Sequence, residues 1–227
     1  MKSLLVLAFA LSTTVRLAAQ DVGARLDGRV PPEVQHAVQD IAADAAAHGL
    51  PTEPLVQKAI EGGAKRVPTE RLIAAVRGLA ARLAGAADAV HAAGLAAPQA
   101  DVVEGGADGL SAGLTAGQVG TLVRASRAPY DPALVLRVAA TLAAIGVPPK
   151  QTVQLVEGLI KDGKSPNDLL GLPGAVQADV AEGATPEQAA EHVGHGGGNM
   201  PPGRPPDFVP PGQSKSHKHT PSNPHKP

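Results

Sequence analysis

One local pattern recurs along the chain and limits how it can fold: a glycine, one residue that is usually aliphatic, and then a proline, serine or threonine. Glycine readily adopts the left-handed backbone that closes many helices, and an aliphatic residue after it can make the closing contact. A serine or threonine then caps the next helix, and proline suits its first turn. The pattern therefore predicts helices joined by very short loops. Its instances are Gly49-Leu50-Pro51-Thr52, Gly113-Leu114-Thr115-Ala116, Gly146-Val147-Pro148-Pro149, Gly163-Lys164-Ser165-Pro166, Gly183-Ala184-Thr185-Pro186 and, without the adjacent glycine, Lys65-Arg66-Val67-Pro68.

Between these boundaries the apolar residues recur every three or four positions, which is the spacing of one helix face. The clearest stripe comprises Leu72, Val76, Leu79, Leu83, Ala86 and Val90. No segment shows the sustained alternation expected of strands. We expect Pro173 to kink or split its helix, and Gly105, Gly106 and Gly109 each to cost about 1 kcal/mol relative to alanine. The expected helices span residues 31–47, 52–63, 68–92, 98–111, 115–127, 131–145, 149–161, 166–181 and 185–193.

Loops this short place consecutive helices antiparallel, as helical hairpins. Residues 49–74 and 146–171 also resemble each other, because each begins with the glycine pattern and contains a Glu-Gly pair with a lysine beyond it. Such a duplication is typical of helical repeats. We therefore predict an all-α fold of tandem antiparallel helical hairpins over residues 20–193, arranged as an α-solenoid or as an irregular helical bundle.

The Glu-Gly dipeptide also occurs at residues 104–105 and 182–183, which raises the question of paired catalytic carboxylates. A general acid and base must converge on one substrate. Glu61 and Glu157 instead fall at equivalent places in separate repeats. We interpret the dipeptide as structural, and we expect Lys65 and Lys161 to offset the unfavourable placement of a glutamate near a helix C-terminus.

The first 19 residues have the features of a secretory signal. Lys2 precedes an apolar stretch at residues 4–11, and residues 17–19 form a plausible cleavage site before Gln20. The alternative is an N-terminal membrane anchor, but the apolar stretch is much shorter than the ~20 residues that a span needs. We therefore expect an exported protein, periplasmic or extracellular, with no integral membrane span. The composition, rich in alanine, glycine and proline, is typical of secreted proteins from bacteria with GC-rich genomes.

Charge divides the remaining chain into an acidic body and a basic tail. Residues 21–193 contain 14 Lys+Arg and 20 Asp+Glu, whereas residues 194–227 contain four Lys or Arg and one acid. Nine prolines and six glycines among the 34 tail residues predict a disordered segment with polyproline II character. We expect the tail either to contact an anionic partner, such as a protein or a cell-envelope component, or to fold back onto the body. Neither part has the strongly basic face of a nucleic-acid-binding protein.

Two places favour contacts with a partner protein. Arg124, Arg127 and Arg137 surround Tyr130, the one aromatic residue of the body, and arginine and tyrosine are favoured at interfaces. The alternative is a solvated turn whose tyrosine ring packs on a neighbouring helix. In the tail, Phe208 lies between proline pairs and offers an apolar anchor, while the prolines could bind an aromatic groove or serve as an extended spacer.

Histidines near the C-terminus indicate an alternative function, namely low-affinity binding of zinc, nickel or copper. A structural metal site needs four ligands in fixed geometry, which a disordered tail does not provide. Histidine also gains charge on acidification, so binding of the tail to an anionic partner should strengthen below about pH 6. The residues concerned are His192, His195, His217, His219 and His225.

The remaining motifs give little support to catalysis. The chain has no cysteine, which excludes disulfides, a thiol nucleophile and cysteine metal ligands. It has no phosphate-binding glycine loop after a predicted strand, and we identify no cofactor. We therefore predict a non-catalytic scaffold protein. An enzyme would need a deep pocket in the body that joins glutamate and histidine residues distant in sequence.

Overall fold

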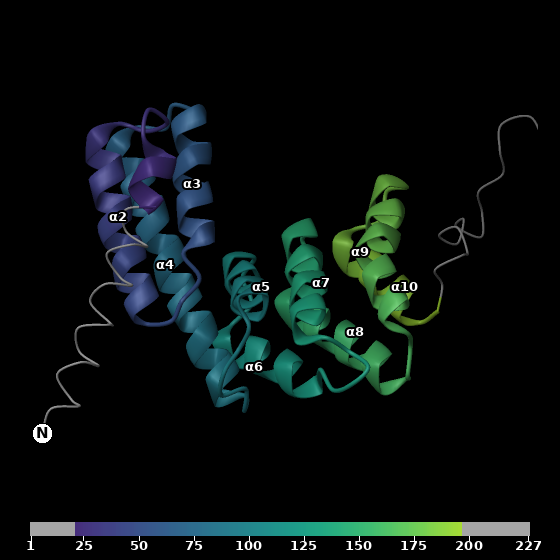
Figure 1. Cartoon of the computed structure of the whole chain (residues 1–227). Helices are drawn as coiled ribbons and strands as arrows, with labels where there is room; N and C mark the ends of the chain where they lie inside the picture. Colours follow the sequence, from purple (N-terminus) through teal and green to yellow (C-terminus); the bar gives the residue numbers. More distant parts are fainter. Residues whose placement is uncertain (1–20, 197–227) are drawn as a thin grey trace, which may run out of the picture.

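The computed structural model describes residues 21–196, and within that range the chain is helical and contains no strand. A helical segment at residues 21–26 precedes the labelled helices (Figure 1). The predicted all-α fold is confirmed, and every expected helix is present with ends within two residues of the prediction. The predicted signal (1–19) lies outside the described residues, as does the tail from residue 197. The helices are α2 (Pro32–Ala47), α3 (Glu53–Ala64), α4 (Thr69–Ala92), α5 (Ala100–Ser111), α6 (Ala116–Ala125), α7 (Pro132–Ile145), α8 (Pro149–Lys161), α9 (Pro166–Ala181) and α10 (Pro186–Gly194).

The predicted helix ends have the expected backbone geometry. Gly146 shows it clearly: its φ is 107°, its N–H donates to the Ala143 oxygen at 3.0 Å, and the Val147 N–H donates to the Leu142 oxygen at 3.1 Å. These are the two hydrogen bonds of a Schellman motif. In the variant link Arg66 takes the left-handed position with a φ of 54°, which is rare for a residue with a side chain. The other predicted glycines with positive φ are Gly49, Gly113, Gly163 and Gly183.

Four of the five caps that the sequence indicates are formed. Thr115, Ser165 and Thr185 each form a capping box with the side chain three residues later. Asp131 accepts a hydrogen bond from the Ala133 N–H at 2.9 Å. Thr52 is an exception, since its side chain makes no capping hydrogen bond. These caps fix where α6, α7, α9 and α10 begin, and so keep the links between them short.

The helices form a three-helix bundle that continues into a two-row array. Helices α2, α3 and α4 all contact one another. Beyond them, each helix also contacts the next but one, so that α5, α7 and α9 form one row and α4, α6, α8 and α10 form the other (Figure 1). Packing on the next-but-one neighbour is the arrangement of an α-solenoid. The chain therefore combines the two predicted arrangements, a bundle in its first part and a solenoid-like array in the rest.

Two hydrophobic clusters hold this assembly together. One joins residues 22–107 and the other residues 89–190. Helix α4 contributes Leu83 and Ala86 to the first cluster and Ala89 and Val90 to the second. With 24 residues, α4 is the longest of the described helices, and it connects the bundle to the array.

The glycines of α5 allow this helix to pack closely against α4 on one side and against α7 on the other. A Cβ atom at Gly105 would lie 3.1 Å from the Leu136 Cβ, and one at Gly106 would lie 3.0 Å from the Ala86 Cβ. Because both distances are shorter than ordinary van der Waals contact, any larger residue would push a neighbouring helix away. The low helix propensity of this segment is thus offset by packing that only glycine permits.

The glycine of the recurring Glu-Gly dipeptide has different surroundings at each position. A Cβ atom at Gly62 would lie 2.2 Å from the Leu72 Cδ1, whereas one at Gly158 would have nothing within 4 Å. Gly183 instead ends α9 with a φ of 105°. Glu61 forms ion pairs with Lys65 and Lys58, the latter at 3.8 Å. The dipeptide is therefore not one repeated functional unit in the described structure.

We expected Pro173 to kink or split its helix, and the helix is not split, because α9 runs without interruption from Pro166 to Ala181. Leu169, Leu172 and Val176 are buried on both sides of the proline. This continuous apolar contact holds the two halves on one core, which compensates for the hydrogen bond that proline cannot donate.

Candidate binding groove between α2 and α4

The largest hollow in the described residues is a groove of about 1150 Å³ between α2 and α4. Its floor consists of small and aliphatic side chains that are half-buried or buried, and its rim is charged and exposed. On α2 the apolar positions follow every fourth residue, and on α4 they follow every third or fourth, so each helix presents one face to the groove. The floor residues are Ala37, Ile41, Ala45, Leu50, Ala80, Ala84 and Ala87.

The rim of the groove is negative. Asp40 and Asp44 come from α2 and Asp88 comes from α4, while Arg77 is the one lysine or arginine among the lining residues. With the histidines neutral, these four side chains have a formal charge of −2. Carboxylates beside an apolar floor favour a ligand that has both an apolar face and positive charge.

Two histidines lie at the same end of the groove, His48 just after α2 and His91 in the last turn of α4. His48 donates from Nδ1 to the Asp44 backbone oxygen at 2.8 Å, and its Nδ1 lies 3.6 Å from the Asp44 Oδ1. Within residues 21–196 no three histidine or acidic side chains are grouped to hold a metal ion.

Sequence reasoning missed this groove. The groove does join histidines and acids that are distant in sequence, as we expected of an enzyme pocket, but the acids are aspartates and the hollow is open. A signal was present in the alanines of α2 and α4, which are too small to fill the space between two helices.

The structure places the predicted arginine and tyrosine residues in different surroundings. The Tyr130 hydroxyl donates to the Lys164 backbone oxygen at 2.5 Å, and its ring packs against the second hydrophobic cluster. Arg124 donates to the Thr121 Oγ1 at 3.2 Å, and Arg127 is exposed in the loop after α6. Arg137 lies on α7 beside Asp108 of α5. Phe208 lies outside the described residues.

The described histidines of the predicted metal set are engaged within the protein. His192 Nδ1 lies 2.7 Å from the Asp179 Oδ2, which links α10 to α9. His195 donates from Nδ1 to the Glu191 backbone oxygen at 2.7 Å. His217, His219 and His225 lie outside the described residues, so the metal prediction stays a prediction.

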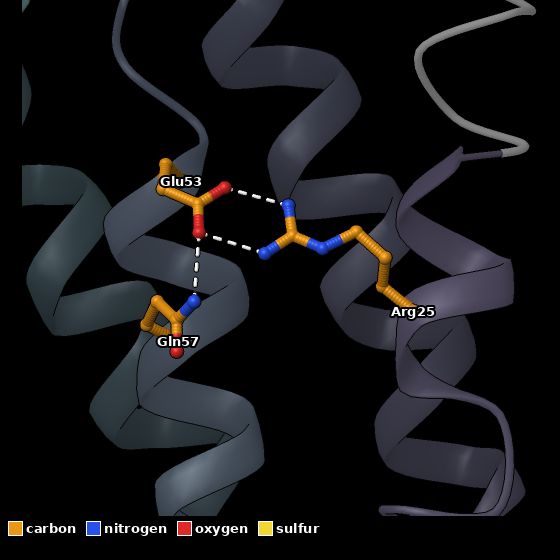
Figure 2. Close-up of polar contacts among 3 residues, drawn as sticks. All are labelled: Arg25, Glu53 and Gln57. Carbon is orange, nitrogen blue, oxygen red and sulfur yellow. Dashed lines mark hydrogen bonds and ion pairs between the residues drawn. The ribbon is translucent and has the colours of Figure 1, made fainter.

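A second group of charges joins the first helical segment to the bundle. Arg25 donates from two guanidinium nitrogens to the two carboxylate oxygens of Glu53, at 2.6 and 2.7 Å, and Gln57 donates to the same carboxylate at 2.8 Å (Figure 2). The hydrogen bonds from Arg25 lower the pKa of Glu53 to about 2. Nearby on α5, burial raises the pKa of Glu104 and of Asp108.

No helix within residues 21–196 is both long enough and apolar enough to cross a bilayer. Comparison of the chain with protein-family models, with characterised proteins and with solved structures gives no match. The function therefore has to be argued from the groove and the charges of this chain alone.

Proposed function

We propose that this chain is a non-catalytic interaction protein whose folded body binds a basic polypeptide segment in the α2–α4 groove. The observation that supports the proposal is the shape and charge of the groove: an open hollow with an alanine-rich floor and a rim of three aspartates against one arginine. We further propose, from the leader-like residues 1–19, that the protein is exported and that its basic tail contacts an anionic partner.

The floor and the rim would contribute to binding in different ways. Small side chains let the backbone of a partner approach closely, and the partner's apolar side chains would lose water against Ile41 and Leu50 at roughly 25 cal/mol per Å². Exposed ion pairs on the rim contribute only about 0–1 kcal/mol each. The aspartates would therefore select a basic partner and speed its association, while the apolar floor supplies most of the affinity.

A helix is a suitable occupant because the groove is lined along its length by the facing sides of two helices. Helices that bind in grooves present apolar residues at every third or fourth position. Basic residues on the flanks of such a helix would then lie over Asp40, Asp44 and Asp88. The probe that follows from this geometry is an alanine-rich helical peptide with a lysine at every fourth position.

The test is a titration of the purified full chain with this labelled peptide, followed by fluorescence anisotropy. The informative variant is Asp40→Asn/Asp44→Asn/Asp88→Asn. Its matched control removes three exposed acids elsewhere, through Asp27→Asn, Asp162→Asn and Glu182→Gln. We expect the groove variant to weaken binding about tenfold or more and the control to change it little, because only nearby charges survive screening at physiological salt.

Filling the groove is the second arm of the experiment. Ala81 and Ala84 line the groove, whereas Ala74 is exposed on α4 outside it. Ala81→Leu/Ala84→Leu should abolish peptide binding, and Ala74→Leu should leave it unchanged. Equal loss in both variants, or no binding of the peptide to the native chain, would refute the proposed function.

A further inference from the structure

We infer that the basic end of the chain's own tail, residues 215–226, docks in the α2–α4 groove of the same molecule and covers it against other partners. This inference rests on the proposed function, because it assigns an occupant to the same groove. The tail would then compete with external partners for the groove. An external basic segment must displace the tail, or an anionic surface must bind the tail and draw it away.

Charge complementarity is the first argument for this occupant. Residues 215–226 contain three lysines, three histidines and no acid. The groove offers three aspartates with only Arg77 opposed to them. The tail segment therefore matches the rim in sign, and its lysines can lie over carboxylates on both walls of the groove. The other titratable groups on the lining are His48 on the α2 side and His91 on the α4 side.

The length of chain outside the described residues is the second argument. The structure describes the chain as far as Gly196, just after α10. From α10 the helices α9, α7, α5, α4 and α2 contact one another in that order. Neighbouring helix axes lie 8–10 Å apart, so these five steps add up to about 40–50 Å measured across the helices. The tail must bridge this distance to reach its own groove.

The proline content of the tail makes it extended enough to reach the groove. Residues 201–211 contain six prolines, and proline-rich segments extend by about 3.1 Å per residue. The 19 Cα–Cα steps from Gly196 to Lys215 would then span about 59 Å, which exceeds the summed helix spacings. The 12 steps from Gly196 to Phe208 span about 37 Å, which is less than those spacings. Reach thus favours the Lys/His segment over the apolar anchor.

The acids of α5 are the competing site for the tail within the described structure. Asp101, Glu104 and Asp108 lie on one face of α5, and Arg137 lines the same hollows as Asp101 and Asp108, so these four side chains have a formal charge of −2, as in the groove. The cavities there measure about 290 to 540 Å³, which is half the volume of the groove or less. The α5 face therefore offers less room at the same formal charge, so the experiment uses it as the control surface.

Because the native chain contains no cysteine, two introduced cysteines can report where the tail lies. We would pair Ser216→Cys with Ala81→Cys, which lines the groove, or with Ala74→Cys, which is exposed on α4 outside it. The expected result is disulfide formation within one chain at least about tenfold faster for the groove pair. Asp40→Asn/Asp44→Asn/Asp88→Asn should remove this difference, and Asp101→Asn/Glu104→Gln should preserve it.

Three results would overturn the inference: equal rates for the two cysteine pairs, a difference that survives loss of the groove aspartates, or disulfides that form only between two chains. The last would make a second copy the occupant.

The lysine peptide separates this failure from failure of the proposed function. In the full chain carrying Lys215→Glu/Lys218→Glu/Lys226→Glu, release of the groove should lower the apparent Kd of the peptide by about threefold if the tail covers two thirds of the molecules. Peptide binding with an unchanged Kd would leave the proposed function intact while refuting self-docking.

Discussion

Arg25 and Glu53 face each other so that both carboxylate oxygens of the glutamate accept a hydrogen bond from the guanidinium (Figure 2). Glu53 is the first residue of α3, where the positive end of the helix dipole also favours a carboxylate. The pair therefore ties the helical segment at residues 21–26 to the start of α3. Since Val22 and Leu26 of that segment are buried in the first hydrophobic cluster, the pair acts together with apolar packing.

The Arg25–Glu53 pair should make a contribution to stability that depends on pH. Its hydrogen bonds lower the pKa of Glu53 from 4.5 to about 2, so the contribution is fully present above pH 4.5 and is lost as the pH falls towards 2. The Glu53 side chain is 56% exposed, and solvent screening limits the effect to about 1 kcal/mol or less. Glu53→Gln should therefore destabilise the protein in urea at pH 7 and much less at pH 2, where most of the contribution is lost. A Glu53→Gln effect that is equal at both pH values would contradict this assignment.

Two glycines that follow a glutamate should respond to alanine in opposite directions. Gly62→Ala places a methyl group against Leu72 and should destabilise the protein by about 1–3 kcal/mol. Gly158→Ala meets open space within α8 and should stabilise it by about 0.5–1 kcal/mol, since alanine is the better helix former. Thermal unfolding of the two variants is the measurement. Changes of the same sign would mean that the close approach of α3 and α4 does not decide the choice of glycine.

The left-handed helix ends allow a second matched comparison. Arg66 holds a φ of 54° at the end of α3, so Arg66→Gly should relieve about 1 kcal/mol of backbone strain, less the extra entropy of glycine in the unfolded chain. Gly49, with a φ of 70° at the equivalent place after α2, should lose about 1 kcal/mol on replacement by alanine. Denaturation midpoints would show the two shifts, and a stabilising Gly49→Ala would count against the proposed ends.

Tyr130 gives a way to separate a structural role from a binding role. Tyr130→Phe removes the hydrogen bond to the Lys164 oxygen and should cost about 0.5–1.5 kcal/mol of unfolding free energy. Arg124→Ala/Arg127→Ala changes exposed side chains and should stay within about 0.5 kcal/mol. If this loop binds a partner, the arginine variant should lose that partner in affinity capture while its stability is unchanged. Capture that persists would remove the loop from the candidate interfaces.

The sequence was most informative where the physics is local. The ends of α2 and α7 follow from Gly49 and Gly146, because a left-handed residue closes a helix whatever surrounds it. The groove could not be predicted in the same way. Ala84 is equally compatible with a packed core and with the floor of a hollow, and only the distance between α2 and α4 decides between them. Pro173 shows the same limit, since α9 continues past it with Leu172 buried before it and Val176 buried after it.

Helix α4 belongs to both hydrophobic clusters, and this has a consequence for how the molecule comes apart. Arrays of stacked helices often lose their terminal units one at a time, because each unit contacts only its neighbours. Here the loss of either cluster would expose the face of α4 that it covers, next to Leu83 on one side and Val90 on the other. Amide hydrogens of α2 and α7 should consequently exchange through a common opening event, so that the bundle and the array behave as one cooperative unit.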